Sequence, residues 1–300
     1  MTFVSAWLFY ALLAPFLFSI INILDKFLRD KHLGTFAMTV LVGFGGFWVL
    51  ALIPFVELPT NPVVVIGGLV VGALFFFSAF PYFQALAIEE ASRVIPLWAL
   101  EAPMVLILAF VFLKERLLVN DYIGFALVVS GAFLVLARKL SNAIKPGKAF
   151  FLMLLASSLT SIGVVVSKWL YSQTSFWSVQ VLAGLGGSIA ALLTFLLFAN
   201  KRRELVKGIL SIKRAVVLQL GFRQLTITAG FIVFGLAIMT GSASLSAALV
   251  QLAAFYVFIM ATFLSRFLPH ILEEKIDKKA LLTKAVAILM IVAGVFAINL

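Results

Sequence analysis

The residue whose chemistry stands out most is Glu101, a carboxylate in the middle of an apolar stretch. Residues 92–116, SRVIPLWALEAPMVLILAFVFLKER, are long enough to cross a bilayer as a helix. A carboxylate at that depth costs a few kcal/mol in hydrocarbon, so a spanning helix keeps it only where protein or water solvates it. We therefore expect Glu101 to face the interior of a helical bundle.

Arg223 is the other charge well inside an apolar stretch, in VVLQLGFRQLTITAGF. Glu101 follows Arg93, and Arg223 follows Arg214, by similar numbers of residues, which places both about 12 to 14 Å deep from the same face. One hypothesis is that Glu101 and Arg223 form a buried pair, or that one binds substrate charge while the other moderates it. The alternative is a static ion pair that orients two helices.

Polar and aromatic side chains at this level could line a binding site with the two charges. They are Asn22, Tyr82, Gln84, Trp98, Gln224, Gln251 and Tyr256. A pocket with few polar groups among aromatic ones suits a small amphipathic solute. Each of them could instead be a hydrogen bond between helices or an aromatic side chain at the membrane interface. Lys26 and Lys168, near the ends of apolar stretches, are expected to extend to the interface.

Several kinds of chemistry are excluded by missing residues. There is no cysteine, and the two histidines, His32 and His270, lie in or beside connecting loops, so we predict no metal site and no cofactor. The absence of GxxxxGK[ST] argues against ATP-driven pumping. No serine–histidine set or pair of aspartates lies within the apolar stretches, so an intramembrane enzyme has no supporting residues.

The composition is that of a multi-pass membrane protein, at 64% hydrophobic and 12% charged residues. The net charge of +11 lies in the gaps between apolar stretches and indicates orientation, not nucleic-acid binding. We predict an all-α membrane protein with ten transmembrane helices, each about 20 residues long. The expected spans are 5–24, 35–56, 63–88, 94–113, 122–137, 149–170, 177–199, 215–240, 244–268 and 281–300.

The two halves of the chain resemble each other. Ser19-Ile20 and Lys26 match Ser161-Ile162 and Lys168 at one constant offset, and Ala91-Ser92 parallels Ala243-Ser244. Leu113-Lys114-Glu115-Arg116 likewise parallels Leu272-Glu273-Glu274-Lys275. We predict a first five-helix repeat over 1–140, a basic linker over 141–148 and a second repeat over 149–300. An odd number of spans per repeat makes the pair inverted, an arrangement common in transporters.

Small residues at helical spacing predict close contacts between helices. The pairs are Gly68 and Gly72, Ala126 and Ser130, and Gly184 and Ser188. Lysine and arginine are concentrated in every second loop, whereas the other loops hold Lys114, Arg116 and Lys168. The positive-inside rule then puts the loop around 201–214 in the cytoplasm and both termini outside.

The sequence resembles the drug/metabolite transporter superfamily, in particular its ten-helix EamA-type branch. The resemblance rests on the YFQALAIEEAS segment (82–92), the proline-containing fourth span, and the LKERL (113–117) and IGFALVVSGAFLVL (123–136) segments, with weaker copies in the second half. It implies an inner-membrane protein that exports or exchanges small metabolites such as amino acids through a central cavity by alternating access. It also implies that both termini face the cytoplasm, opposite to the charge count.

We therefore predict a secondary transporter, not an enzyme, for a small polar or zwitterionic metabolite in a bilayer. Glu101 would take a proton or a substrate amine and Arg223 a substrate carboxylate, with protons as the expected coupling ion. The alternatives are a nucleotide-sugar or lipid-precursor translocator, which would need more basic groups in the cavity, and a non-transporting membrane scaffold with a dry core. The sequence leaves open whether the chain forms a homodimer.

Overall fold

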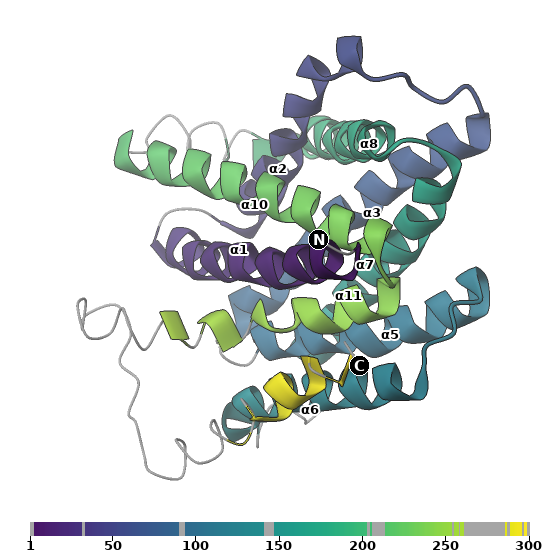
Figure 1. Ribbon diagram of the computed structural model, residues 1–300. Coiled ribbons are helices and arrows are strands. Elements are labelled where there is room, and N and C mark those ends of the chain that lie inside the picture. The colour runs from purple at the N-terminus through teal and green to yellow at the C-terminus, as the bar shows by residue number, and fades with distance from the viewer. Residues whose placement is uncertain are drawn as a thin grey trace.

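The computed structural model is helical throughout the part of the chain that it describes. That part comprises residues 3–31, 34–89, 94–140, 147–202, 205, 214–253, 255–257, 259–260, 286, 289–295 and 297–298. Within these residues there is no strand. The all-α prediction is thus confirmed for the described chain, and Figure 1 shows its helices lying side by side in a bundle.

The described chain is divided into helices joined by short turns and loops. In chain order they are α1 (Phe3–Lys31), α2 (Thr35–Phe44) with the 3-10 turns η1 (Gly45–Ala51) and η2 (Ile53–Phe55), α3 (Pro62–Ile88), the 3-10 turn η3 (Ile95–Leu100) leading into α5 (Glu101–Leu108) and the π-helical turn η4 (Ala109–Leu113), α6 (Val119–Leu140), α7 (Lys148–Gln173), α8 (Phe176–Leu197), α10 (Arg214–Thr240) and α11 (Ala243–Val250).

Five helical segments are long and apolar enough to cross a membrane: Ala6–Asp25, Pro62–Ile88, Lys148–Gln173, Phe176–Leu197 and Arg214–Thr240. They coincide with five of the expected spans. Shorter apolar helices cover Thr35–Ala51, Leu97–Leu113 and Val119–Gly131. Most of the expected span 281–300, and the last part of 244–268, lie outside the described residues, so the total of ten spans stays a prediction.

The fourth expected span changes its helical geometry just before Glu101. Pro96 lies in η3 and Pro103 in α5, and proline supplies no backbone N–H to the helix ladder. The backbone changes there from 3-10 to α geometry, so Glu101 is the first residue of α5. The helix ends in a π turn followed by Lys114, whose φ of 54° is in the left-handed region.

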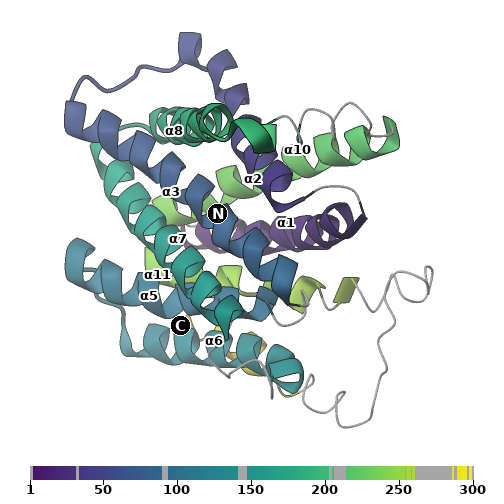
Figure 2. The ribbon, with the colours of Figure 1, turned by 180° about the vertical axis from the view of Figure 1, so that it is seen from behind.

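Side chains from distant parts of the sequence pack the helices in pairs. α3 packs against α7 and α8, α1 against α10, α2 against α8, and α5 against α7 and α11. The views in Figures 1 and 2 agree in placing α3 beside α7 and α1 beside α10. The core between these helices is largely formed by buried aliphatic and aromatic residues, including Phe83, Met153 and Leu170.

Most of the predicted small-residue contacts are present between α8 and its neighbours α3 and α2. A Cβ atom on Gly72 would lie 1.8 Å from the carbonyl oxygen of Ala183, and one on Gly68 would lie 2.5 Å from the Cβ of Leu182. Ser188 donates a hydrogen bond to the carbonyl oxygen of Gly43 at 3.1 Å. The helices are therefore in backbone contact, as small residues permit. Ala126 and Ser130 differ, because both are exposed on α6.

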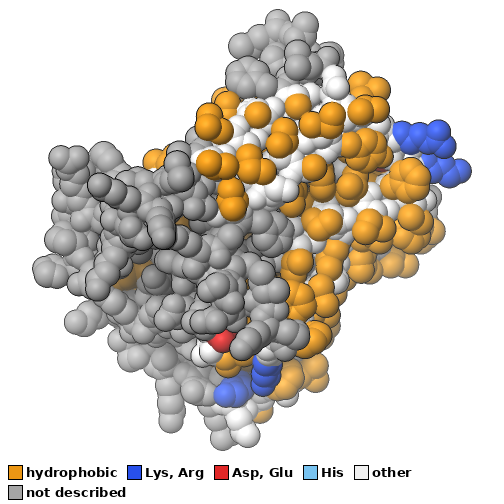
Figure 3. All heavy atoms as spheres, turned by 90° about the horizontal axis from the view of Figure 1, so that it is seen from below, with side chains coloured by type: hydrophobic (Ala, Val, Ile, Leu, Met, Phe, Trp, Pro, Cys, Tyr) orange, Lys and Arg blue, Asp and Glu red, His pale blue; other side chains and the backbone are white. Residues whose placement is uncertain are grey.

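The outer surface carries many large apolar side chains. Phe112, Leu197 and Leu225 are each more than 70% exposed, and apolar side chains cover most of the described surface in Figure 3. A water-soluble protein seldom presents an apolar surface of this extent. The surface therefore agrees with the long apolar helices in indicating a lipid environment.

Candidate functional site

A cavity of about 340 Å³ lies inside the bundle. Its lining comes from nearly every described helix, with residues of α1, α3, α7, α8, α10 and α11 and of the η1 and η3 turns. The polar members of the lining include Asn22, Asp25, Ser78, Tyr82, Glu101, Thr160, Ser167, Tyr171, Gln180, Arg223, Gln224, Thr228 and Gln251. Aromatic and aliphatic side chains form the rest of the wall, as in small-molecule sites.

Glu101 is placed in this wall by the start of α5 and is only 8% exposed. The side chains of Thr160 on α7 and Gln251 at the end of α11 are its hydrogen-bonding neighbours. Ser161, part of the repeated Ser-Ile pair, donates to the backbone carbonyl of Glu101 at 3.3 Å and holds α7 against this turn. In the described part of the chain, no lysine or arginine forms an ion pair with Glu101.

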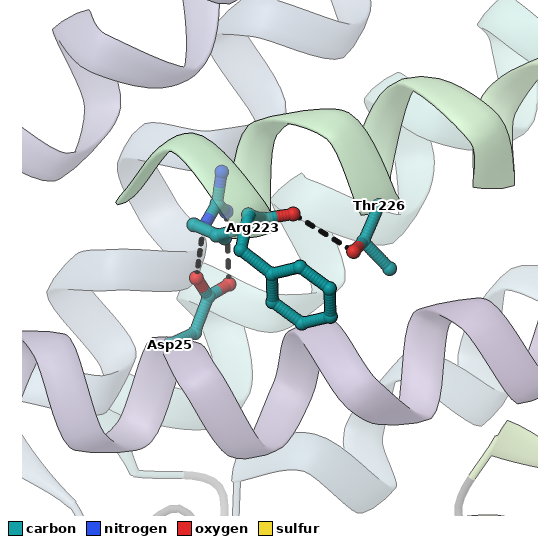
Figure 4. Close-up of polar contacts among 4 residues, drawn as sticks. Asp25, Arg223 and Thr226 are labelled. Atoms are coloured by element: carbon teal, nitrogen blue, oxygen red, sulfur yellow. Dashed lines mark hydrogen bonds and ion pairs between the residues drawn. The ribbon is translucent and has the colours of Figure 1, made fainter. Parts of the chain in front are cut away.

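Arg223 also lines the cavity, but its partner is Asp25 on α1. The guanidinium Nη2 donates to Asp25 Oδ2 at 3.1 Å, and Nε donates to Oδ1 of the same carboxylate. Figure 4 shows the two side chains facing each other across the α1–α10 contact. Both are buried, and the two-point contact is the geometry in which arginine binds carboxylates most strongly.

This pairing corrects the hypothesis that Glu101 and Arg223 form a buried pair. Equal depth was the basis of that hypothesis, and depth does not specify which side of a helix a side chain faces. Because α10 packs along α1, Arg223 meets the carboxylate of α1. Asp25 was expected at a span end, but α1 continues to Lys31, which leaves Asp25 more than one turn inside the helix and 3% exposed.

Five further predicted site residues line the cavity with Glu101 and Arg223. They are Asn22, Tyr82, Trp98, Gln224 and Gln251. The rings of Tyr82 and Trp98 are 5.3 Å apart at an angle of 47°. Gln224 occupies the space beside Gly45, where a Cβ atom would lie 1.8 Å from its Nε2. These residues come from separate helices and meet at one cavity.

Two predicted site residues are elsewhere. Gln84 is exposed on α3, because two residues of α-helix turn the side chain about 200° away from Tyr82. Tyr256 is half-buried, and its ring lies edge-on to that of Phe16 with centroids 5.8 Å apart. Neither residue belongs to the cavity lining.

Several polar groups of the lining were not predicted from the sequence. Asp25 precedes Lys26, and Thr160 precedes Ser161, so both adjoin residues of the repeat match. Tyr171 and Gln180 lie on facing helices near Gly235, where a Cβ atom would come within 2.7 Å of the Tyr171 hydroxyl oxygen. Proximity to the repeated residues was the available signal for the first two, and none marks the other two.

Lys168 contacts helix ends and does not line the cavity. Its Nζ donates to the carbonyl oxygens of Ile238, Met239 and Gly241 at 2.8, 3.3 and 2.6 Å, at the end of α10. These contacts were not predicted, and the expected extension of Lys168 to the membrane interface stays a prediction. A cation at this position stabilises the negative end of the helix dipole.

Glu115, in the loop between η4 and α6, places its carboxylate at the start of α11. Its carboxylate accepts from the hydroxyl of Ser242 and from the backbone N–H groups of Ala243 and Ser244, the latter two at 3.2 and 3.3 Å. An anion there stabilises the positive end of α11. We call Lys168, Glu115 and the turn 238–244 the turn clasp. In it, residues of both predicted halves meet.

Metal chemistry has no set of ligands in the described chain, where no group of three or more histidine, aspartate or glutamate residues comes together. The fold and site are those of a helical membrane protein with an apolar exterior and a partly polar internal cavity. Residues 5–137 match the model of the EamA-like transporter family. This part of the chain is therefore similar to that family, whose members are membrane transporters of the drug/metabolite type.

The fold also extends beyond the matched residues. A solved structure titled "Crystal structure of protein" superposes with a TM-score of 0.71 over 98% of this chain and 95% of that chain, at 16% sequence identity. At that identity the likeness concerns the fold alone. No curated protein matches the chain.

Proposed function

We propose that the protein is a secondary transporter that exports or exchanges a small amine-bearing metabolite through this cavity. The observation that supports the proposal is Glu101, a buried carboxylate in the cavity wall with no cationic partner in the described chain. A buried charge of this kind requires compensation. A substrate amine would supply it, and in the exchange step a proton would replace the amine.

The proposed mechanism is alternating access between two inverted five-helix repeats, over 1–140 and 149–300. Packing between helices of the two halves supports it. α1 contacts α10 as α7 contacts α3, and α2 contacts α8 as α5 contacts α11. In each case a helix of one repeat meets a helix of the other, so the cavity lies between the repeats and a rocking motion would expose it to each side in turn.

The cavity favours transport over the alternatives. A non-transporting scaffold would fill its core with side chains, whereas this core contains a space of about 340 Å³. A nucleotide-sugar or lipid-precursor translocator would need several basic groups to bind phosphates. Among the described lining residues, Arg223 is the basic one, and its guanidinium is bound by Asp25.

The test is transport by the reconstituted full chain with a panel of amino acids, purines and organic cations. Glu101→Gln should lower the uptake rate of the transported solute about tenfold or more, because hydrogen bonds to charged groups contribute about 1.5–3 kcal/mol. Glu57→Gln, which removes a carboxylate from an exposed residue outside the lining, is the matched control and should transport normally. Full transport by the Glu101 variant would contradict the proposal.

The orientation and assembly of the transporter are part of the same proposal. The charge count favours both termini outside, and the family resemblance favours both inside. Because the chain has no cysteine, single cysteines introduced in 200–214 can be labelled with an impermeant reagent. Labelling from outside would show that the orientation predicted from the charge count is wrong. Light scattering of the purified protein would test for a homodimer.

A further inference from the structure

We propose that Asp25 determines the charge of the transported substrate, and that the site takes an organic cation with an aromatic or apolar body. This inference rests on the proposed transport function and makes it specific. It is carried by three side chains that line the same cavity, Asp25, Glu101 and Arg223.

The cavity lining has more acidic than basic side chains. Among the described lining residues, the acidic and basic side chains are two carboxylates and one guanidinium, so one negative charge is unbalanced whenever Glu101 is ionised. Lys168 does not change this sum, because it lies outside the lining and its ammonium group is held by three carbonyl oxygens. A site with one unbalanced negative charge in an apolar surrounding favours a monocation over a zwitterion or an anion.

The guanidinium of Arg223 is already bound by a carboxylate of the protein. Two of its nitrogens, Nε and Nη2, donate to the two carboxylate oxygens of Asp25. A substrate carboxylate would have to displace this two-point contact to gain the same interaction. While Asp25 is in place, Arg223 offers little binding energy to a carboxylate.

Aromatic side chains in the cavity wall indicate what the body of the substrate would be. Trp98 lies three residues before Glu101 at the end of a 3-10 turn, a spacing at which side chains project from the same side. Tyr82 lies against Trp98, and Phe18, Phe75 and Phe231 form a second aromatic group in the wall, with Phe231 centroids 5.6 and 5.4 Å from the other two. Aromatic faces next to a carboxylate bind ammonium groups by charge and by cation–π contact.

The probes are phenethylamine and phenylalanine, which share a ring and an ammonium group and differ in one carboxylate. Binding and uptake are measured with the full chain, purified and reconstituted. The wild type should bind phenethylamine at least about tenfold more tightly than phenylalanine, and Glu101→Gln should remove that preference, since about 1.4 kcal/mol corresponds to tenfold. Glu57→Gln should behave as the wild type.

Asp25→Asn is the decisive variant, because it frees Arg223 and leaves Glu101 in place. Phenylalanine should then bind about tenfold more tightly than it does to the wild type, with its carboxylate on Arg223 and its ammonium group on Glu101. Phenylalanine, and not phenethylamine, should also raise the melting temperature of this variant. A merely structural role of Asp25 would not reverse selectivity.

Two further variants keep the test informative if Asp25→Asn does not fold. The double variant Asp25→Asn with Arg223→Gln restores one unbalanced negative charge and should prefer phenethylamine as the wild type does. Arg223→Gln alone removes the positive charge that balances Asp25, and it should keep or strengthen that preference. Loss of amine preference in either folded variant would overturn the inference.

Failure of this inference can be told apart from failure of the transport proposal. A wild type that binds phenylalanine as well as phenethylamine, or binds neither, overturns the assignment of substrate charge. If Glu101→Gln still slows transport of another solute in the panel, the proposed function stands. If the wild type moves no solute of the panel, both fail.

Discussion

Asp25 with Arg223 and Glu115 with Lys168 are two groups of opposite charges that join different helices, and they satisfy their charges in different ways. The first pair binds itself, at the N-terminal half of α10, and borders the cavity. In the second group, each charge binds the end of a helix: Lys168 at the end of α10 and Glu115 at the start of α11. Of the turn clasp, Ile238 lies in the cavity lining, whereas Lys168 and Glu115 do not.

This difference separates a pair that a substrate can rearrange from a group that holds the backbone. A ligand in the cavity can reach Asp25 and Arg223 and compete for either charge. The backbone groups bound by Lys168 and Glu115 have no such competitor, and they belong to a turn that connects two helices. We therefore expect changes in the pair to alter selectivity and changes in the turn clasp to alter stability.

Lys168→Met should have the largest effect on stability. It removes three charge-assisted hydrogen bonds from the end of α10 and leaves Glu115 without its neighbouring cation. We expect the free energy of unfolding in detergent to fall by about 3 kcal/mol, measured by thermal or denaturant unfolding. The affinity of the folded variant for phenethylamine should stay within about twofold of wild type, a change of about 0.4 kcal/mol.

Lys148→Met is the control for that variant, because Lys148 is exposed at the start of α7 and its replacement should change the unfolding free energy by less than about 0.5 kcal/mol. If Lys168→Met unfolded like the wild type but lost the ligand, Lys168 would belong to the binding site and the comparison would fail.

Glu115→Gln should have a smaller effect of the same kind. The amide keeps one acceptor oxygen for the N–H groups of α11 but loses the charge that favours them. The expected loss is about 1–2 kcal/mol in unfolding free energy, the range for caps and helix-end charges. Asp121→Asn, at an exposed cap that accepts from Leu118 N–H at 2.9 Å, should cost less. Equal losses of unfolding free energy in the two variants would show that burial of the turn clasp adds nothing to stability.

The sequence was sufficient for the helices and for one wall of the cavity. Long apolar runs placed α3, α7, α8 and α10 correctly, and the lone carboxylate Glu101 was correctly expected to face the interior. These features depend on composition along one helix. They need no knowledge of how neighbouring helices are rotated.

The contacts between helices were where the predictions were wrong. Arg223 was matched with Glu101 by depth, but the rotation of α10 against α1 gives it Asp25. For Lys168 the prediction named the interface and no partner, and its contacts with the carbonyl oxygens at the end of α10 were missed. Its repeat counterpart Lys26, and Ser92 and Glu274, which match Ser244 and Glu115, lie outside the side chains that the structure describes.

Gln84→Ala should have the smallest effect. Gln84 is a polar residue within a membrane helix that belongs neither to the cavity lining nor to the turn clasp. Its replacement should change the unfolding free energy by less than about 0.5 kcal/mol and leave phenethylamine binding unchanged. Tyr82→Phe, on the opposite side of the same helix, is the matched change inside the cavity. If Gln84→Ala weakened phenethylamine binding more than Tyr82→Phe does, the ligand would bind on the other side of α3. The balance of charges in the lining, on which the role of Asp25 depends, would then no longer describe the binding site.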